Sequence, residues 1–317
     1  MAKKSSKIWW IMGTGAVLFA LFMVIIAGVL LCRFMPEIKA FSPIGKKIAV
    51  LDLRGGIYES EGLISIIHDY RDDPTVAAVV VYIDSPGGGA ASTHEVYTEL
   101  LALKEHDKKV YAYMSTIAAS GGYYIACAGD KIYANPGTLT GSIGVILSFT
   151  NVEGLFGKIG VSSKVVKSGR YKDIGSPFRP MTPEEEALLG EMVDDVYNQF
   201  LDVVVEGRYP AIAAKLAAEG EETPTRYQVR RYVMEYADGR IFSGRQGREY
   251  GFVDELGNFE QCLDDVARDL GIEGEPTIVR KRLKEDSMSD LFFEALHEKL
   301  VASTEPESKV ELEYSLY

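Results

Sequence analysis

The sequence has few histidines and cysteines and a shortage of positive charge. Its 317 residues include four histidines and three cysteines. The cysteines, Cys32, Cys127 and Cys262, lie far apart with none of the spacings of zinc ligands, so they predict neither a metal site nor a disulfide framework. Acidic residues outnumber basic ones by 46 to 34, which leaves a net charge of −12. Because duplex binding needs a basic surface, we expect no nucleic-acid partner.

Nucleotide-binding signatures are also missing. Neither GxxxxGK[ST] nor GxGxxG occurs, and we expect no cofactor. The remaining composition, with 47% hydrophobic residues, 31 glycines and 12 prolines, excludes a disordered or collagen-like chain. The length allows two domains at most.

One apolar run stands out near the N-terminus. Residues 8–31 carry no charge, and a helix of this length covers about 36 Å, enough to cross a bilayer. Lys3, Lys4 and Lys7 precede the run and Arg33 follows it, which predicts a cytoplasmic N-terminus and an exported remainder. A cleaved signal peptide is the alternative, but it needs a shorter run and a small-residue cleavage site. We therefore expect an uncleaved, single-pass anchor in contact with membrane lipid.

Strand and helix patterns alternate in the rest of the chain. Strands are expected at 47–53, 76–84 and 109–114, and helices at 61–70 and 91–103. Thr182 followed by Pro183 predicts the start of a further helix. The alternation predicts an α/β fold with a mostly parallel sheet, in which a ligand binds at the carboxyl ends of the strands.

Two strand ends carry unusual residues. Three consecutive glycines, 87–89, follow the second strand, where most glycine-rich segments are simple turns. Ser120 follows the third strand where a helix is about to begin. This serine is either a helix N-cap or a nucleophile placed where free N–H groups favour an oxyanion.

A nucleophilic serine needs a base, and no histidine is well placed to serve. The four histidines are His68, His94, His106 and His297. A lysine with a pKa lowered by burial is the other choice. The candidates are Lys164, Lys167 and Lys172, and residue type does not choose among them.

Three long motifs, at residues 82–89, 115–145 and 168–185, resemble the signal peptide peptidase A, or protease IV, family of membrane-anchored serine peptidases. The resemblance covers roughly residues 46–270. It implies a crotonase/Clp-protease-like fold of repeated ββα units, of the single-unit type because no second serine motif occurs. Clp-type peptidases of this fold use a histidine that is missing here, and export argues against acyl-CoA chemistry.

The family pattern implies a Ser/Lys dyad. Ser120 would be the nucleophile, Lys172 the general base, and Ser142 the residue that orients the lysine amine. The alternative for Lys172 is a surface ion pair with Asp173. Backbone N–H groups of Gly121 and of Gly87 or Gly88 would form the oxyanion hole.

The resemblance also implies substrates and partners. Hydrophobic peptides, above all remnant signal peptides left after secretion, are the expected substrates. Misfolded or specific membrane proteins are alternative substrates, and an inactive peptide-binding scaffold is an alternative function. A homo-oligomer is expected, in which the lysine can come from a neighbouring copy.

The sequence thus predicts five segments in a bacterial-type inner membrane protein with an extracytoplasmic catalytic domain. They are a cytoplasmic N-terminus (1–7), a transmembrane signal anchor (8–31), a linker (32–45), the peptidase domain (46–275) and a charged C-terminal tail (276–317).

Overall fold

The computed structural model describes residues 46–220 and 223–281. The predicted anchor at 8–31, the segments 1–7 and 32–45 beside it, and residues 282–317 of the predicted tail lie outside this range. Among the described residues, no helix combines the length and the apolar character needed to cross a bilayer.

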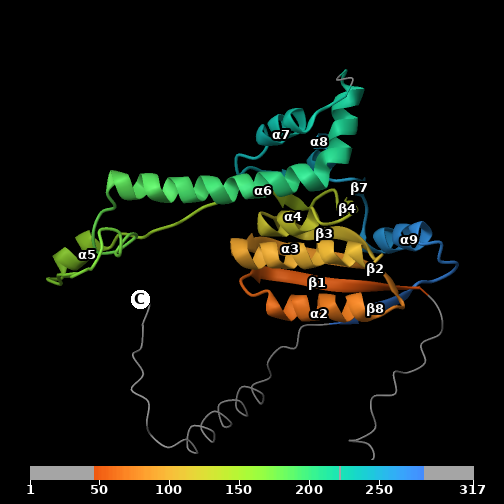
Figure 1. Ribbon diagram of the computed structural model, residues 1–317, viewed down its shortest axis with the longest axis horizontal. Coiled ribbons are helices and arrows are strands. Elements are labelled where there is room, and N and C mark those ends of the chain that lie inside the picture. The colour runs from red at the N-terminus through yellow and green to blue at the C-terminus, as the bar shows by residue number, and fades with distance from the viewer. Residues whose placement is uncertain (1–45, 221–222, 282–317) are drawn as a thin grey trace, which may run out of the picture. The chain divides into compact units, whose positions relative to one another are not determined.

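A mostly parallel sheet of eight strands organises the described part of the chain (Figure 1). The main strand order is β6-β5-β3-β2-β1-β8, and β4 pairs with β3 and with β7. Only the β5 and β6 pair is antiparallel among these strands. The strands are β1 (Lys47–Ile57), β2 (Val76–Gly88), β3 (Lys109–Ala119), β4 (Lys131–Ala134), β5 (Leu139–Gly141), β6 (Ile241–Ser243), β7 (Glu255–Leu256) and β8 (Thr277–Lys281). The predicted α/β fold with a mostly parallel sheet is confirmed.

Helices cover both faces of this sheet. The helices of the described residues are α2 (Glu61–Asp72), α3 (Ala90–Glu105), α4 (Gly121–Ala126), α5 (Glu153–Lys158), α6 (Pro183–Ala218), α7 (Arg226–Met234), α8 (Gly244–Tyr250) and α9 (Phe259–Asp269). Alternate residues of β1 enter different cores, because side chains of a strand alternate between faces. Ala49 and Leu51 pack with residues of α2, α3, α4 and α6, whereas Ile48 and Val50 pack with residues of α9.

The three central strands are longer than the sequence pattern predicts, and this changes one expectation. The glycines at 87 and 88 do not form a loop, because β2 continues through them and pairs with the end of β1, Gly56 with Gly87 and Ile57 with Gly88. The hydrophobic pattern of β2 stops at its polar and glycine residues, but the backbone hydrogen bonds to β1 continue through them. At the other end of the domain, β8 pairs with β1 beyond the boundary expected at residue 275.

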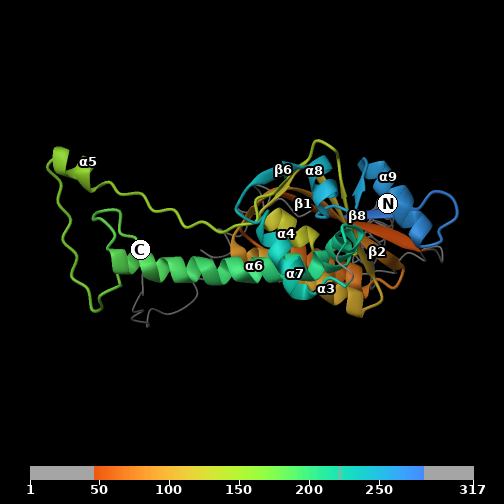
Figure 2. The same ribbon diagram turned by 90° about the horizontal axis from the view of Figure 1, so that it is seen from above.

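Helix α6 carries a projecting segment, here called the arm, which comprises residues 146–182 between β5 and α6. The first half of α6 runs beyond the sheet, and α5 with its flanking segments lies at this outer end (Figures 1 and 2). Thr182 caps α6 in a capping box with Glu185, and Pro183 opens the helix as expected. Within the arm, Val152 N–H donates to Pro177 O at 2.7 Å, so its two sides are joined.

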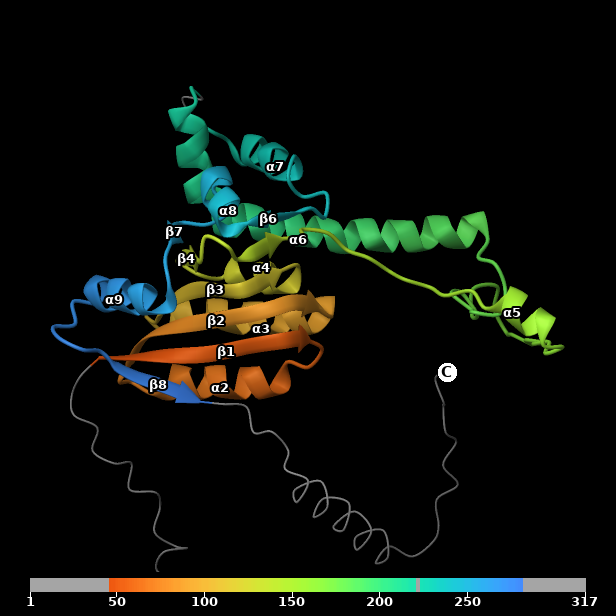
Figure 3. The same ribbon diagram turned by 180° about the vertical axis from the view of Figure 1, so that it is seen from behind.

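The second half of α6 lies beside α4 and the sheet (Figure 3). A buried arginine anchors this half of the helix. The Arg208 side chain is 2% exposed and forms a forked pair with Asp254, with Nη1 and Nη2 at 2.8 and 2.6 Å from the carboxylate oxygens. Its Nε also donates to Gly251 O at 3.1 Å. Asp254 in turn accepts from Ile132 N–H of β4 at 2.7 Å, so the pair joins α6 to the sheet.

Replacing Arg208 by Ala should lower the free energy of unfolding by about 3 kcal/mol, because it leaves Asp254 without its cation and opens a gap under α6. Chemical denaturation followed by circular dichroism measures the change. Arg268→Ala is the control, since Arg268 is 75% exposed in its pair with Asp265 and should cost less than about 1 kcal/mol. Equal losses in both variants would contradict this role of Arg208.

Candidate active site

Ser120 occupies a strained turn between β3 and α4. Its φ of +53° and ψ of −120° are rare for a residue with a side chain, and such strain is typical of functional sites. The turn is held from both sides, because Ser120 N–H donates to Gly141 O and Ser120 O accepts from Tyr124 N–H, both at 2.9 Å. Although Ser120 is the N-cap residue of α4, its side chain makes no capping hydrogen bond. The hydroxyl is therefore available for chemistry, and the N-cap alternative does not describe its side chain.

Glycines let the end of β2 approach this turn. A Cβ on Gly87 would lie 2.6 Å from Gly121 N and 2.9 Å from Ser120 Cβ, and its φ is +101°. A Cβ on Gly121 would lie 2.7 Å from Thr93 Oγ1 and 3.3 Å from Gly88 N. The structure thus brings Ser120, Gly121, Gly87 and Gly88 together with backbone against backbone.

The N–H groups of the two β2 glycines point in different directions. Gly87 N–H donates to Ser85 Oγ at 3.1 Å. Gly89 N–H donates to Ile57 O of β1 at 2.8 Å, and N–H directions alternate along a strand. The N–H of Gly88 therefore points to the opposite edge of β2, toward β3 and the Ser120 turn.

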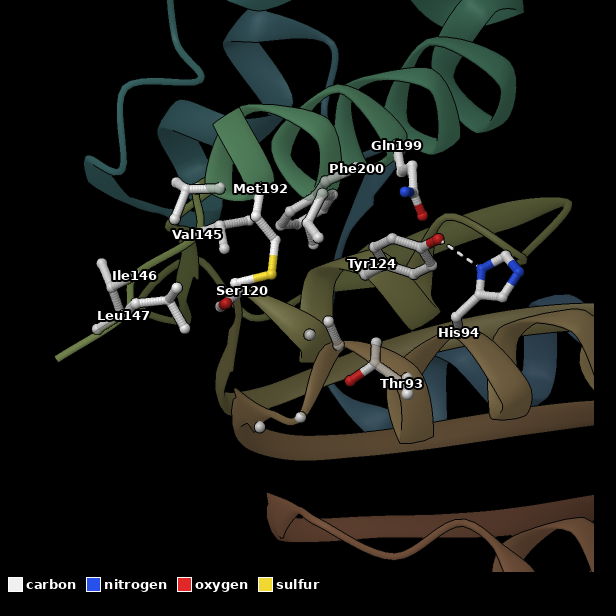
Figure 4. A pocket seen from close by; sticks show the side chains of 18 residues that line it. Thr93, His94, Ser120, Tyr124, Val145, Ile146, Leu147, Met192, Gln199 and Phe200 are labelled. Carbon is white, nitrogen blue, oxygen red and sulfur yellow. Dashed lines mark hydrogen bonds between the residues drawn. The ribbon is translucent and has the colours of Figure 1, made fainter. Parts of the chain in front are cut away.

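A cavity of about 590 Å³ opens beside Ser120, between the strand ends and α6 (Figure 4). Its walls are largely apolar, and the side chains that form them are Tyr124, Val145, Ile146, Met192, Val196 and Phe200. Met192 extends from α6 toward Ser120 (Figure 4). This hollow is suited to an extended, hydrophobic ligand.

The cavity also carries polar groups that sequence patterns did not reveal. His94 Nδ1 lies 2.7 Å from the Tyr124 hydroxyl, and this pair points away from Ser120 (Figure 4). Thr93 Oγ1 is buried and has no hydrogen-bond partner among residues 46–220 and 223–281. Thr93 and His94 belong to α3, and Tyr124 belongs to α4. The signal in the sequence is that Thr93 and His94 follow the glycine run by about one helical turn.

The other described histidines are engaged elsewhere. His68 bonds to Glu99 at 2.8 Å, and His106 bonds to Ala102 O at 3.0 Å. His297 lies outside the described residues. The thiols of Cys127 and Cys262 are buried, and burial raises the pKa of each to about 12. Both thiols therefore stay protonated at neutral pH, unlike a catalytic cysteine.

Ser142 lies next to the Ser120 turn. Its predecessor Gly141 pairs with Ala119 and accepts the Ser120 N–H, and Ser142 N–H donates to Arg240 O at 2.8 Å. Ser142 has a φ of +51°, so it is a second strained serine at the same edge of the sheet. Ser142 therefore lies beside the Ser120 turn, and its role in orienting Lys172 stays a prediction.

Lys172 lies apart from these residues, in the arm. The segment between α5 and α6 that contains it is at the outer end of α6 (Figure 2). Of the arm, Ile146 and Leu147 line the Ser120 cavity and Lys172 does not. Asp173 does not pair with Lys172, because its carboxylate is bonded to Arg179 and Lys167. The surface ion pair considered as the alternative for Lys172 is therefore absent from the described part of the chain.

Gly87→Ala should remove most of the reactivity of Ser120. The added Cβ meets backbone atoms of the Ser120 turn, so the turn must shift, which we expect to slow labelling of Ser120 by a fluorophosphonate about a hundredfold. Mass spectrometry of the labelled peptide measures the rate. Gly137→Ala is the control, because its Cβ has no neighbour nearer than 3.9 Å. Unchanged labelling of Gly87→Ala would show that the turn tolerates the shift.

Comparison with known proteins identifies the family of this chain. The sequence pattern of peptidase family S49 matches residues 102–226, which include Ser120, Ser142 and Lys172. A Synechocystis protein named as a protease is 42% identical over 230 residues, which cover 72% of this chain and 76% of the relative.

Two further relatives have longer chains. An Enterococcus faecium protein named as signal peptide peptidase SppA is 36% identical over 212 residues, which cover 67% of this chain and 56% of the relative. Protease 4 of Salmonella typhi is 30% identical over 240 residues, which cover 73% of this chain and 36% of the relative. The chain therefore belongs to peptidase family S49 and is a serine peptidase similar to SppA and protease 4.

Proposed function

We propose that this protein is a membrane-anchored endopeptidase that cleaves hydrophobic peptides with a Ser120 and Lys172 dyad. The observation that carries the proposal is the Ser120 turn. Its backbone is strained, its hydroxyl makes no capping hydrogen bond to α4, and it lies at the edge of an apolar cavity. Strain at such a strand-to-helix turn presents the hydroxyl for attack, as it does at the nucleophile elbow of other hydrolases.

Gly88 and Gly121 supply the oxyanion hole in this proposal. The N–H of Gly121 belongs to the first turn of α4, where N–H groups have no partner within the helix. Gly88 is favoured over Gly87 because Gly87 N–H already donates to Ser85 Oγ. Two backbone donors then face the oxygen of the attacked carbonyl, where the negative charge develops.

The reaction follows the two-step course of acyl transfer. A neutral Lys172 amine takes the Ser120 proton as Oγ bonds to the peptide carbonyl carbon, and the same proton then goes to the leaving amine. Ser142 accepts a hydrogen bond from the amine and orients it. In the second step Lys172 takes a proton from water as the water attacks the ester carbon. It then gives this proton to Ser120 Oγ as the ester bond breaks, which releases the acyl product as a carboxylic acid and restores the enzyme.

A neighbouring copy supplies Lys172 in this proposal. Its basis is the place of Lys172 on the arm, away from the Ser120 cavity of its own chain. The arm also exposes large apolar side chains, among them Ile146 at 87% and Val166 at 91%, and exposed apolar surface of this kind is typical of a contact with another protein. Head-to-tail contacts between copies form a ring when the rotation between neighbours closes, and in such a ring each arm serves the next Ser120.

The substrate proposal rests on the cavity and on the relatives. Apolar walls beside Ser120 suit hydrophobic segments, and the name of the Enterococcus relative, signal peptide peptidase, points to signal peptides. An anchor at residues 8–31 would hold the domain at the outer face of an inner membrane, close to such remnants in the lipid. Misfolded or specific membrane proteins are the alternative substrates. Comparing the peptides in membranes that contain Ser120→Ala with those in membranes that contain the wild-type protein separates these substrates from signal peptides. If the protein is an inactive scaffold, the two sets of peptides should be the same.

Lys172→Ala and Ser120→Ala should each lower hydrolysis of an apolar fluorogenic peptide at least about a thousandfold, because dyad members act as a unit. Lys164→Ala is the matched control, since Lys164 is an exposed arm lysine and should leave the rate unchanged. Loss of activity in Lys164→Ala with full activity in Lys172→Ala would assign the base to a different residue.

Co-assembly tests the origin of the lysine. When Ser120→Ala and Lys172→Ala are expressed together, a site with both groups forms where a Lys172→Ala copy receives the arm of a Ser120→Ala copy. Random mixing in a ring should restore about a quarter of the wild-type rate in the purified complex. Two inactive variants that stay inactive together would mean that each chain uses its own lysine.

A further inference from the structure

A charge network holds the turn that contains Lys172. The Arg179 guanidinium bonds the Asp173 carboxylate through Nε at 3.0 Å and Nη2 at 2.8 Å, and it also donates to Asp173 O at 3.1 Å. The same guanidinium bonds Glu185 through Nη1 and Nη2 at 2.7 and 2.6 Å. Arg179 therefore connects the residue after Lys172 directly to the first turn of α6.

The network is attached to α6 through the Glu185 side chain. Glu185 has a side chain that is 4% exposed, and it accepts the Thr182 N–H at 3.0 Å in the capping box of α6. Hydrogen bonds from Arg179 and from the Thr182 backbone lower the pKa of Glu185 to about 2. Glu185 is thus charged at neutral pH, and its position is set by a 36-residue helix. Arg179 connects the turn that contains Lys172 to Glu185, and so holds this turn in place on α6.

The network also occupies the carboxylate nearest to Lys172 in sequence. Bonds to Arg179, and next to Lys167, lower the pKa of Asp173, so this group is charged as well. Arg170 of the arm pairs with Glu184 of α6 at 3.2 Å. The ion-paired groups around the turn are Lys167, Arg170, Asp173, Arg179, Glu184 and Glu185, and they balance in sign. The exposed Glu186, which lines a small cavity with Arg179, is a further carboxylate of this α6 turn. The Asp173 carboxylate itself is held by Arg179 and Lys167.

We propose that Arg179 is a positioning residue for Lys172, which fixes the lysine turn on α6 and keeps the Asp173 carboxylate away from the lysine amine. This inference rests on the proposed dyad. A general base must be neutral before it can accept a proton, and a free carboxylate beside an amine favours its charged form. Arg179 serves both needs, because its planar fork holds two carboxylates at once.

The test is the pH dependence of Ser120 labelling by a fluorophosphonate in the full chain purified in detergent. Arg179→Gln removes one positive charge, so the amine loses its proton less readily. We expect the acidic limb of the rate profile to move up by about one pH unit and the rate at pH 7 to fall about tenfold. Arg179→Gln/Asp173→Asn removes one charge of each sign, and the limb should return to the wild-type pH. Arg179→Lys keeps the charge without the fork, so it should lower the maximal rate without moving the limb.

The outcomes are distinct. An unmoved limb in Arg179→Gln, with a wild-type melting temperature, overturns the inference. If Arg179→Gln unfolds, Arg179→Lys and Arg179→Gln/Asp173→Asn are compared with the wild type instead. Both should keep the acidic limb of the rate profile at the wild-type pH, and an equal shift of this limb in both variants would also overturn the inference. Wild-type labelling of Lys172→Ala would instead refute the dyad itself, whatever Arg179 does.

Discussion

The hydrogen bond from Ser120 N–H to Gly141 O is the contact on which the site depends. It links the ends of β3 and β5 and holds Ser120 at a φ of +53°. Without it the chain could relax into an ordinary helix N-terminus, in which a serine side chain caps the helix and is no longer free. The close approach of Gly87 supports the same turn from the other side, because a side chain there would meet Gly121 N at 2.6 Å. Parallel pairing brings both contacts to one edge of the sheet.

Sequence patterns predicted this edge well because period-two and helical spacing report burial. They placed Ser120 at a strand-to-helix junction and the glycines at the end of the neighbouring strand, and the structure has both. They misjudged where β2 ends, since Gly87 and Gly88 carry no side chains that could show a pleat while their backbones still pair with β1. Orientation of an N–H group leaves no mark in a sequence, so the choice between Gly87 and Gly88 needed the hydrogen bonds.

The relation between Ser120 and Lys172 was beyond any local pattern. Helical spacing and the cap at Thr182 predict that a helix follows Lys172, but they do not say that the first half of this helix leaves the sheet. Spacing likewise could not show that Arg179, rather than Lys172, takes the Asp173 carboxylate. The course of α6 and the bond between Arg179 and Asp173 both depend on contacts between segments, which a local sequence pattern does not report. The separation is thus a property of the tertiary structure, and it supports the assembly that the family resemblance implies.

An enzyme built as proposed would link assembly to activity. A serine hydroxyl without a base is a weak nucleophile, so a lone copy would hold Ser120 in a strained but idle turn. The exposed apolar side chains of the arm favour association, and in the proposed ring the same contact delivers the lysine. Burial in that contact also supplies what the amine needs, because removal from water favours its neutral form. One apolar surface would then drive assembly, bring Lys172 to Ser120 and lower the pKa of the lysine amine.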